Sequence, residues 1–366
     1  MSASQRNGGP DTSRGTILVL QGGGALGAYE CGVYKALAER LDDLSVVAGC
    51  SIGAINASVI ASHYGEADRG VGALEALWRD LSFPPLPTPP MLSWIPWVRL
   101  LGSHQAVLTS MLLGNPRLFQ PALPGGAPYT TDAMRATVAG SMGTYAKGGD
   151  PRLIVTAVEL ESSKPVAFDS AKINITPDHI VASGSLPPAF PPTEIGGKHY
   201  WDGGLWSNTP LPEVLAAVRG SDRAASPAAG FQIYIVDVFP QRFVAPDSTL
   251  PTQAEVQARM GQIIYQDKTR ADTAASQWVT WCHELYEILE AIPPAVVANL
   301  EPPLRQRATG ALDAMAAAKS RVPVTVTHIQ RESLPYEQVS CGVDFSADRI
   351  DGLIAQGEHD ARRALA

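Results

Sequence analysis

The sequence has few cysteines, no cluster of basic residues and no apolar segment at its start, and each absence argues against a class of protein. Its four cysteines, spread over 366 residues without a Cys-x-x-Cys pair, indicate reduced thiols, not a disulfide framework or a zinc site. A net charge of −8 makes nucleic acid an unexpected partner and provides no polybasic segment for anionic lipids. Residues 1–15 are polar and rich in Gly and Ser, unlike a signal peptide, so we expect a disordered tail and a cytoplasmic protein.

What the chain does have is enough apolar residues for a large core, since hydrophobic residues make up 45% of it. Short apolar segments with the character of buried strands occur at 16–20, 45–48, 152–158, 231–238 and 322–327. Segments with helical character occur at about 28–40, 54–61, 252–290 and 346–363. This alternation predicts an α/β layered fold around a mainly parallel sheet.

The most informative motif is Gly49-Cys50-Ser51-Ile52-Gly53, which has the form Gly-x-Ser-x-Gly. It lies between the predicted strand at 45–48 and the predicted helix at 54–61. At such a junction the glycines permit a turn tight enough to hold a serine hydroxyl clear of the sheet. The N-terminus of the following helix directs partial positive charge at the same point. The motif therefore predicts a nucleophile elbow with Ser51 as the nucleophile.

A glycine loop, Gly22-Gly23-Gly24-Ala25-Leu26-Gly27, joins the predicted strand at 16–20 to the predicted helix at 28–40. Backbone N–H groups of Gly22, Gly23, Gly24 and Ala25, at a helix N-terminus, would form a cradle for an anion. In an acyl hydrolase this cradle would be the oxyanion hole.

The same loop also fits the Gly-x-Gly-x-x-Gly fingerprint of dinucleotide-binding proteins. That fingerprint expects an acidic residue at the end of the next strand, to hold the ribose. Here the next strand ends in Gly49-Cys50-Ser51, and Asp42 and Asp43 lie before it. The sequence therefore favours the oxyanion hole over a nucleotide site.

A third segment, Asp202-Gly203-Gly204, follows a predicted hairpin at 193–200 that turns at Gly196-Gly197. The glycines allow another part of the backbone to come close to Asp202. Taken alone, this segment favours an ordinary turn aspartate.

Together the three segments resemble the patatin-like family of lipid acyl hydrolases. The resemblance is close over 16–212 and includes Ala182-Ser183-Gly184-Ser185-Leu186-Pro187-Pro188-Ala189-Phe190-Pro191-Pro192, a stretch typical of bacterial members. It implies a three-layer α/β/α fold around a mainly parallel sheet, with a catalytic domain at 16–245. Residues 246–366 would then form a C-terminal helical extension with a closing strand.

The resemblance implies a Ser–Asp dyad, in which Asp202 is the base for Ser51 and neither metal nor other cofactor takes part. An ordinary α/β-hydrolase would instead use a histidine after the acid in chain order. His328 and His359 come late enough, but neither lies in a loop with small or glycine neighbours, so surface or strand-end roles are favoured. His199 is near Asp202 in sequence, and the hairpin explains its position equally well.

Two residues depart from the family's usual pattern. Leu26 stands where many members carry Lys or Arg, so cationic help to the oxyanion would be missing. Cys50 stands where others often carry threonine, which adds an oxidisable thiol near the site.

We therefore expect a serine acyl hydrolase of the phospholipase A type, cleaving a lipid-like carboxylic ester through an acyl-enzyme. The same dyad would serve an intracellular polyester or thioester hydrolase. A non-catalytic lipid-binding regulatory protein that keeps the fold is the third alternative, against which the retention of all three motifs argues.

An insertion at about 81–130 separates the first helices from the next clear strand. Its first part is uncharged but contains six prolines, which would break a membrane-spanning helix. Its apolar centre, with Trp94, Trp97, Leu100 and Leu101, could line an acyl pocket or form a flap in a lipid headgroup layer. A core flap or dimer contact explains these residues equally well. The expected partners are thus an acyl lipid and, at the periphery, a membrane.

Overall fold

The structure is a computed structural model of the chain. It describes residues 15–41, 43–83, 113–122, 126–219, 230–239, 260–261, 263–265, 296, 298–319, 324–332 and 341–366. The expected tail at 1–14, most of the predicted helical region at 252–290, and the apolar residues Trp94, Trp97, Leu100 and Leu101 lie outside the described residues.

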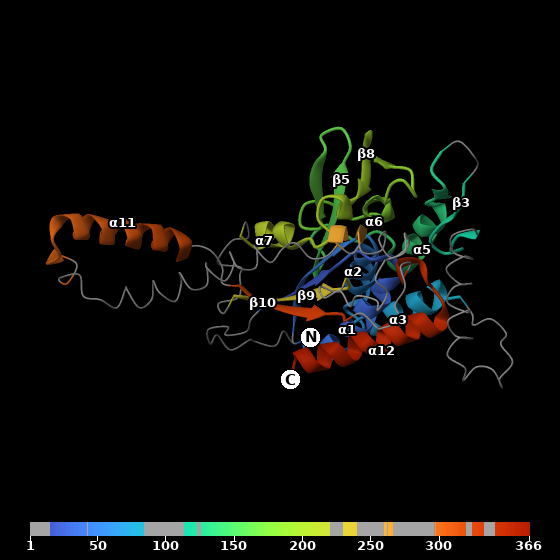
Figure 1. Cartoon of the computed structure of the whole chain (residues 1–366), viewed down its shortest axis with the longest axis horizontal. Helices are drawn as coiled ribbons and strands as arrows, with labels where there is room; N and C mark the ends of the chain where they lie inside the picture. Colours follow the sequence, from blue (N-terminus) through green and yellow to red (C-terminus); the bar gives the residue numbers. More distant parts are fainter. Residues whose placement is uncertain are drawn as a thin grey trace, which may run out of the picture.

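A mainly parallel sheet of eight described strands forms the centre of the molecule, in the order β10-β9-β1-β2-β5-β8-β7, with β6 paired to β5 (Figure 1). The strands are β1 (Gly15–Leu20), β2 (Leu44–Cys50), β5 (Arg152–Glu159), β6 (Lys164–Asp169), β7 (Thr193–Ile195), β8 (Lys198–Asp202), β9 (Phe231–Asp237) and β10 (Val324–Gln330). Strands β10, β9, β1, β2 and β5 run parallel, whereas β6, β7 and β8 are antiparallel additions at the β5 end. A separate small sheet pairs β3 (Gln120–Pro121) with β4 (Tyr129–Thr130).

Helices cover both faces of this sheet. The described helices are α1 (Gly27–Ala38), α2 (Ile52–His63), α3 (Val71–Leu81), α5 (Asp132–Met142), α6 (Pro177–Gly184), α7 (Leu211–Arg219), α11 (Pro302–Lys319) and α12 (Ala347–Ala364). Because side chains alternate along a strand, β1 divides its apolar residues between two cores. Leu18 and Leu20 pack with α1, α2 and α12, while Ile17 and Val19 pack with α7. The expected three-layer α/β/α architecture is confirmed.

The structure also shows how individual turns and element ends are formed. The hairpin between β7 and β8 turns at Gly196 and Gly197, with φ of 60° and 78°, conformations that favour glycine. At the start of α6, the N–H group of Thr176 donates to His179 Nδ1 at 3.0 Å, and proline occupies the first turn. One strand begins earlier than expected, because Gly15, assigned to the tail, is the first residue of β1.

The C-terminal part of the chain is built into the sheet and its helical layer. Strand β10 pairs in parallel with β9, and α12 lies along α1 (Figure 1). Glycines allow the two helices to touch: a Cβ at Gly32 would lie 1.9 Å from the carbonyl oxygen of Ile354, and one at Gly357 would lie 2.0 Å from that of Tyr29. The Tyr29 hydroxyl also donates to Asp360 Oδ2 at 3.1 Å. Residues 324–366 are thus part of the same core as residues 15–83.

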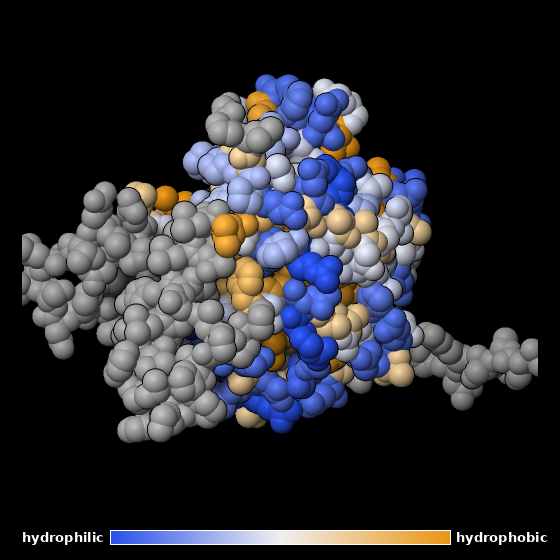
Figure 2. All heavy atoms as spheres, turned by 90° about the vertical axis from the view of Figure 1, so that its right-hand side faces the viewer, coloured by the Kyte–Doolittle hydropathy of each residue, from blue (hydrophilic) through white to orange (hydrophobic). Residues whose placement is uncertain are grey.

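The molecule has a mixed outer surface on the side that Figure 2 presents, where hydrophilic residues separate patches of hydrophobic ones. Within the ranges that the structure describes, no helix combines the length and apolar character that crossing a bilayer requires.

Candidate functional site

Ser51 occupies the turn between β2 and α2 with φ of 55° and ψ of −125°, a backbone conformation that is uncommon for a residue with a side chain. A Cβ added at Gly49 would lie 2.1 Å from the carbonyl oxygen of Gly53, and one at Gly53 would lie 2.6 Å from that of Leu20. Strand β2, helix α2 and the end of β1 therefore approach so closely that only glycine fits at both positions. Helix α2 starts at Ile52, so its N-terminus points at the serine.

A residue of α6 accepts the main-chain N–H of this strained turn. The N–H group of Ser51 donates to Ser183 Oγ at 2.9 Å, and Ser183 is completely buried. This contact explains one feature of the stretch that resembles bacterial patatins, because the hydroxyl of Ser183 fixes the main chain at the turn.

Asp202 is brought to Ser51 by the register of three strands. Cys50, at the end of β2, pairs with Thr156 of β5, and the neighbouring Ala157 pairs with Asp202 at the end of β8. The two strand ends therefore meet across β5, and the Ser51 side chain lies close enough to the Asp202 carboxylate to lower its pKa.

The Asp202 carboxylate is 2% exposed and accepts hydrogen bonds from two donors. Its Oδ1 accepts the N–H of Gly204 at 2.7 Å and the thiol of Cys50 at 3.6 Å. Burial raises the pKa of Asp202 from 3.8 to about 6, against the opposing effect of the nearby Ser51 hydroxyl and of the hydrogen bonds from Gly204 and Cys50. Asp202 is thus a stronger base than a solvated aspartate.

The sequence suggested an oxidisable thiol at Cys50, but the structure gives this side chain an environment that keeps the thiol protonated. It is completely buried, and burial together with the negative charge of Asp202 raises the pKa of the thiol well above its usual range. A thiol becomes reactive as the thiolate. In this structure Cys50 instead acts as a neutral hydrogen-bond donor to Asp202.

The glycine loop lies directly beside Ser51. A Cβ at Gly22 would lie 2.9 Å from Ser51 Cβ, and one at Gly24, where φ is 59°, would lie 2.2 Å from the carbonyl oxygen of Gly342. Gly22 is already paired on both sides by Asn208, whose carbonyl accepts its N–H at 3.3 Å and whose Nδ2 donates to its carbonyl at 2.8 Å. Leu26 is completely buried, so the position where relatives often carry a cation faces the core here.

Sequence reasoning gave no role to the two amides that anchor this loop, Asn208 and Gln21. Gln21 is completely buried, and its Nε2 donates to Thr209 Oγ1 at 3.1 Å while its Oε1 accepts the N–H of Val238 at 2.9 Å. The available signals were a polar residue directly after a buried strand and an Asn-Thr pair shortly after the Asp-Gly-Gly segment.

The structure places the candidate histidines away from Ser51. His328 lies on β10, three strands from β2 and so about 14 Å away across the sheet, and its Nδ1 lies 2.9 Å from Asp237 Oδ2. His359 is exposed on α12. His199 is exposed, bonds to Glu161 at 2.8 Å, and points to the opposite face of β8 from Asp202.

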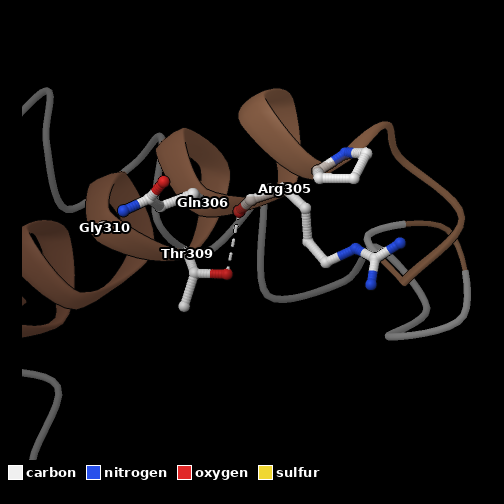
Figure 3. Close-up of a pocket in the computed structure, with 5 residues that line it drawn as sticks. Arg305, Gln306, Thr309 and Gly310 are labelled. Carbon is white, nitrogen blue, oxygen red and sulfur yellow. Dashed lines mark hydrogen bonds between the residues drawn. The ribbon is translucent and has the colours of Figure 1, made fainter.

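The described residues offer no alternative to the Ser51 site, either as a metal site or in the hollow on α11. Among the described residues, no three His, Cys, Asp or Glu side chains lie together as metal ligands would. The hollow has a volume of about 490 Å³ and is open to solvent (Figure 3). Its lining residues are Pro302, Arg305, Gln306, Thr309 and Gly310. All of them come from one helix, which extends away from the sheet in Figure 1.

Comparisons with solved structures and curated proteins give local or distant matches. The crystal structure of VipD from Legionella pneumophila aligns with a TM-score of 0.37 and 13% identity, covering 97% of this chain and 67% of that one. Lysophospholipase nte1 of Aspergillus terreus (strain NIH 2624 / FGSC A1156) is 39% identical over 80 residues, which is 19% of this chain and 5% of the relative. Lysophospholipase NTE1 of Mycosarcoma maydis is 41% identical over 76 residues, 18% of this chain and 4% of the relative. The chain thus matches only a small part of the length of these curated relatives.

Family models match much more of the chain. A model described as patatin-like phospholipase matches residues 18–215, which include the glycine loop, the Ser51 turn and Asp202. A second model, described as patatin phospholipase, matches residues 263–366. Because the first model alone covers more than half of the sequence, this chain belongs to the patatin-like phospholipase family.

Proposed function

We propose that the protein is a serine acyl hydrolase that cleaves a lipid-like carboxylic ester, with Ser51 as the nucleophile and Asp202 as its base. One observation carries the proposal: the buried Asp202 carboxylate lies beside the side chain of a serine held in a strained turn at a helix N-terminus. Membership of the patatin-like phospholipase family and the lysophospholipase names of the two fungal relatives support the same chemistry.

In the first half of the reaction, Asp202 accepts the hydroxyl proton of Ser51 while the serine oxygen attacks the ester carbonyl. The tetrahedral intermediate collapses, the alcohol leaves with the proton from Asp202, and the acyl group stays on Ser51. Water then attacks the acyl-enzyme with Asp202 again as the base, which releases the acid and restores the serine. A pKa of about 6 suits this role, because the carboxylate is ionised at neutral pH and still basic enough to accept a proton.

The oxyanion would be held by the glycine loop. Gly22 already donates its N–H to Asn208, whereas the N–H groups of Gly23 and Gly24 make no hydrogen bond to any described residue. We therefore assign the donors to Gly23 and Gly24, with Ala25 next in line at the start of the helical turn. Fixed N–H donors lower the barrier because they stabilise charge that develops in the transition state.

The apolar surface beside the site supports an acyl lipid as the substrate. Leu205 and Trp206 follow the Asp202 turn directly and are 46% and 60% exposed. Ile263 and Ile264, which precede Tyr265 near the same turn, are 48% and 43% exposed. Large exposed apolar side chains on two segments at one site are suited to an acyl chain or to the surface of a lipid aggregate. Peripheral contact with a membrane follows as part of the proposal.

Active-site labelling with a fluorophosphonate probe tests the nucleophile. The probe should modify wild type at Ser51, as located by peptide mass spectrometry, and should leave Ser51→Ala unmodified. Ser58→Ala is the matched control, because Ser58 is a buried serine on the same helix that bonds only to Ile55 O. Labelling that persists in Ser51→Ala would remove the serine-hydrolase assignment.

A substrate panel then tests the class of ester. Phospholipid, soluble ester, thioester and polyester substrates should be compared with wild type and Ser51→Ala. Turnover of the phospholipid that depends on Ser51 supports the proposal. Turnover confined to thioester or polyester would replace the lipid with one of those substrates, and a folded protein that binds lipid without labelling or turnover would be a binding protein.

A further inference from the structure

Tyr265 comes from the part of the chain that the second family model matches, yet it lies against the Asp202 turn. Its main-chain carbonyl accepts Asn208 Nδ2 at 3.0 Å and Gln21 Nε2 at 3.3 Å. Asn208 and Gln21 are the two amides that anchor the glycine loop. The main chain at Tyr265 is therefore held by the same network that positions Gly22.

The ring of Tyr265 lies beside the turn that contains Asp202. A Cβ added at Gly204 would lie 3.7 Å from Tyr265 Cε1 and 3.1 Å from Asp202 Oδ1, so the ring edge and the carboxylate both approach this glycine. Phe239 packs beside the ring, with the two ring centroids 6.0 Å apart. The half-buried ring thus packs near both Phe239 and the Gly204 turn.

We propose that Tyr265 is a positioning residue for Asp202: its ring keeps water from the carboxylate, and its carbonyl holds the amides that anchor the glycine loop. The proposal rests on the proposed function, in which Asp202 is the base. Exclusion of water disfavours the charged form of a carboxylate and so makes it a stronger base. The C-terminal part of the chain then supplies one wall of the site.

The titratable groups around Asp202 allow a clean test. Cys50, at the end of β2, and Tyr265 interact electrostatically with Asp202. Glu213 of α7 interacts in the same way with Cys50. Burial, followed by the negative charge of Asp202, raises the pKa of the Tyr265 hydroxyl, and burial raises that of the Cys50 thiol. Both groups therefore remain neutral at pH 5–8, where Asp202 itself titrates.

The experiment measures kcat and kcat/KM on a short soluble ester from pH 4.5 to 9 for wild type, Tyr265→Phe and Tyr265→Ala. In the pH–rate profile of wild type, the midpoint of the acidic limb should lie near pH 6. Tyr265→Ala should move this limb down by about one pH unit, because water reaches the carboxylate. A base weaker by one unit lowers turnover by at most about tenfold, since the Brønsted slope does not exceed one. Tyr265→Phe keeps the ring and should match wild type.

Tyr234→Ala is the matched control, because Tyr234 is a half-buried tyrosine on β9, opposite Leu18 and Thr327 in the register. It should lower stability without moving the limb. If Tyr265→Ala does not fold, Tyr265→Leu gives partial cover and should shift the limb by a smaller amount in the same direction. A folded Ala or Leu variant with an unchanged limb overturns the proposal, and so does a Phe variant that behaves like Ala.

A measurement without turnover separates this proposal from the proposed function. The gain in unfolding free energy from Asp202→Asn should grow with pH in the wild-type background, and it should grow less in the Tyr265→Ala background. That result supports the shielding role even if the fluorophosphonate probe fails to label Ser51. An equal gain in both backgrounds overturns the shielding role even if labelling succeeds.

Discussion

Replacing Asp202 with Asn should abolish hydrolysis and at the same time stabilise the fold above pH 6. The expectation follows from burial, because the folded protein holds a carboxylate at 2% exposure whose pKa is about 6, whereas the unfolded chain has the ordinary 3.8. Asparagine has the same shape, and its Oδ1 can still accept from Gly204 and Cys50. The variant keeps the packing and loses only the charge.

The magnitude follows from the difference in pKa. Each pKa unit corresponds to about 1.4 kcal/mol, so the rise from 3.8 to about 6 makes ionised Asp202 destabilising by about 3 kcal/mol at neutral pH. Below the unfolded pKa, Asp202 is protonated in both states and contributes nothing. Between 3.8 and about 6 the folded state holds more protons than the unfolded state, so stability falls as pH rises. The advantage of Asp202→Asn should therefore grow by about 1.5 kcal/mol between pH 5 and pH 8.

Urea unfolding at fixed ionic strength, followed by circular dichroism at pH 5, 6, 7 and 8, measures this advantage. Asp351→Asn, an exposed position on α12, controls for the loss of one negative charge. An advantage that stays constant from pH 5 to pH 8, or that shrinks, would refute the argument that Asp202 is a buried, ionised base. Hydrolysis that survives in Asp202→Asn would refute its assignment as the base.

Three further predictions concern the rest of the site and the fold. Gly23→Ala, whose Cβ would lie 2.7 Å from Val238 Cγ2, should lower kcat by roughly 10²–10³-fold with little effect on binding of a non-reactive ester analogue. Equal losses of turnover and of analogue binding would show that the loop binds the substrate in its ground state. His328→Ala should keep most of the turnover, and a dead variant of normal melting temperature would indicate a Ser–acid–His triad. Gly357→Ala should lower the unfolding free energy by about 1–3 kcal/mol, because the added methyl group would overpack the contact between α12 and α1. Gly352→Ala, on the same helix but facing open space, should have no such effect. Equal effects of the two substitutions would show that α12 and α1 are not tightly packed at Gly357.

The sequence predicted those parts of the site that depend on neighbouring residues. The Gly-x-Ser-x-Gly turn and the hairpin before Asp202 are short patterns in which glycine is required by local backbone geometry, so they can be recognised without a structure. The layered α/β fold followed from the alternation of segments.

Contacts between distant segments could not be predicted in the same way. Nothing local to Gln21 indicates that its side chain joins Thr209 to Val238, because these residues come together only when β1 lies next to β9. Leu26 shows the same limit, because the sequence gives an apolar residue in the glycine loop and only the structure shows that its side chain is buried in the core. The direction of a side chain in a helical turn depends on the packing around it and not on the motif alone.

The C-terminal part of the chain is needed for the geometry of the glycine loop. The main chain at Gly342 fills the space that a side chain at Gly24 would occupy, and the carbonyl of Tyr265 binds the amides that hold Gly22. Helix α12 packs on α1, the helix that begins directly after the loop. Both ends of the loop therefore depend on the region that the second family model matches, because Gly342 lies against Gly24 directly and Tyr265 holds Gly22 through Asn208. A chain cut after residue 245 would retain Ser51 and Asp202 but would lose the contacts that fix the proposed oxyanion donors.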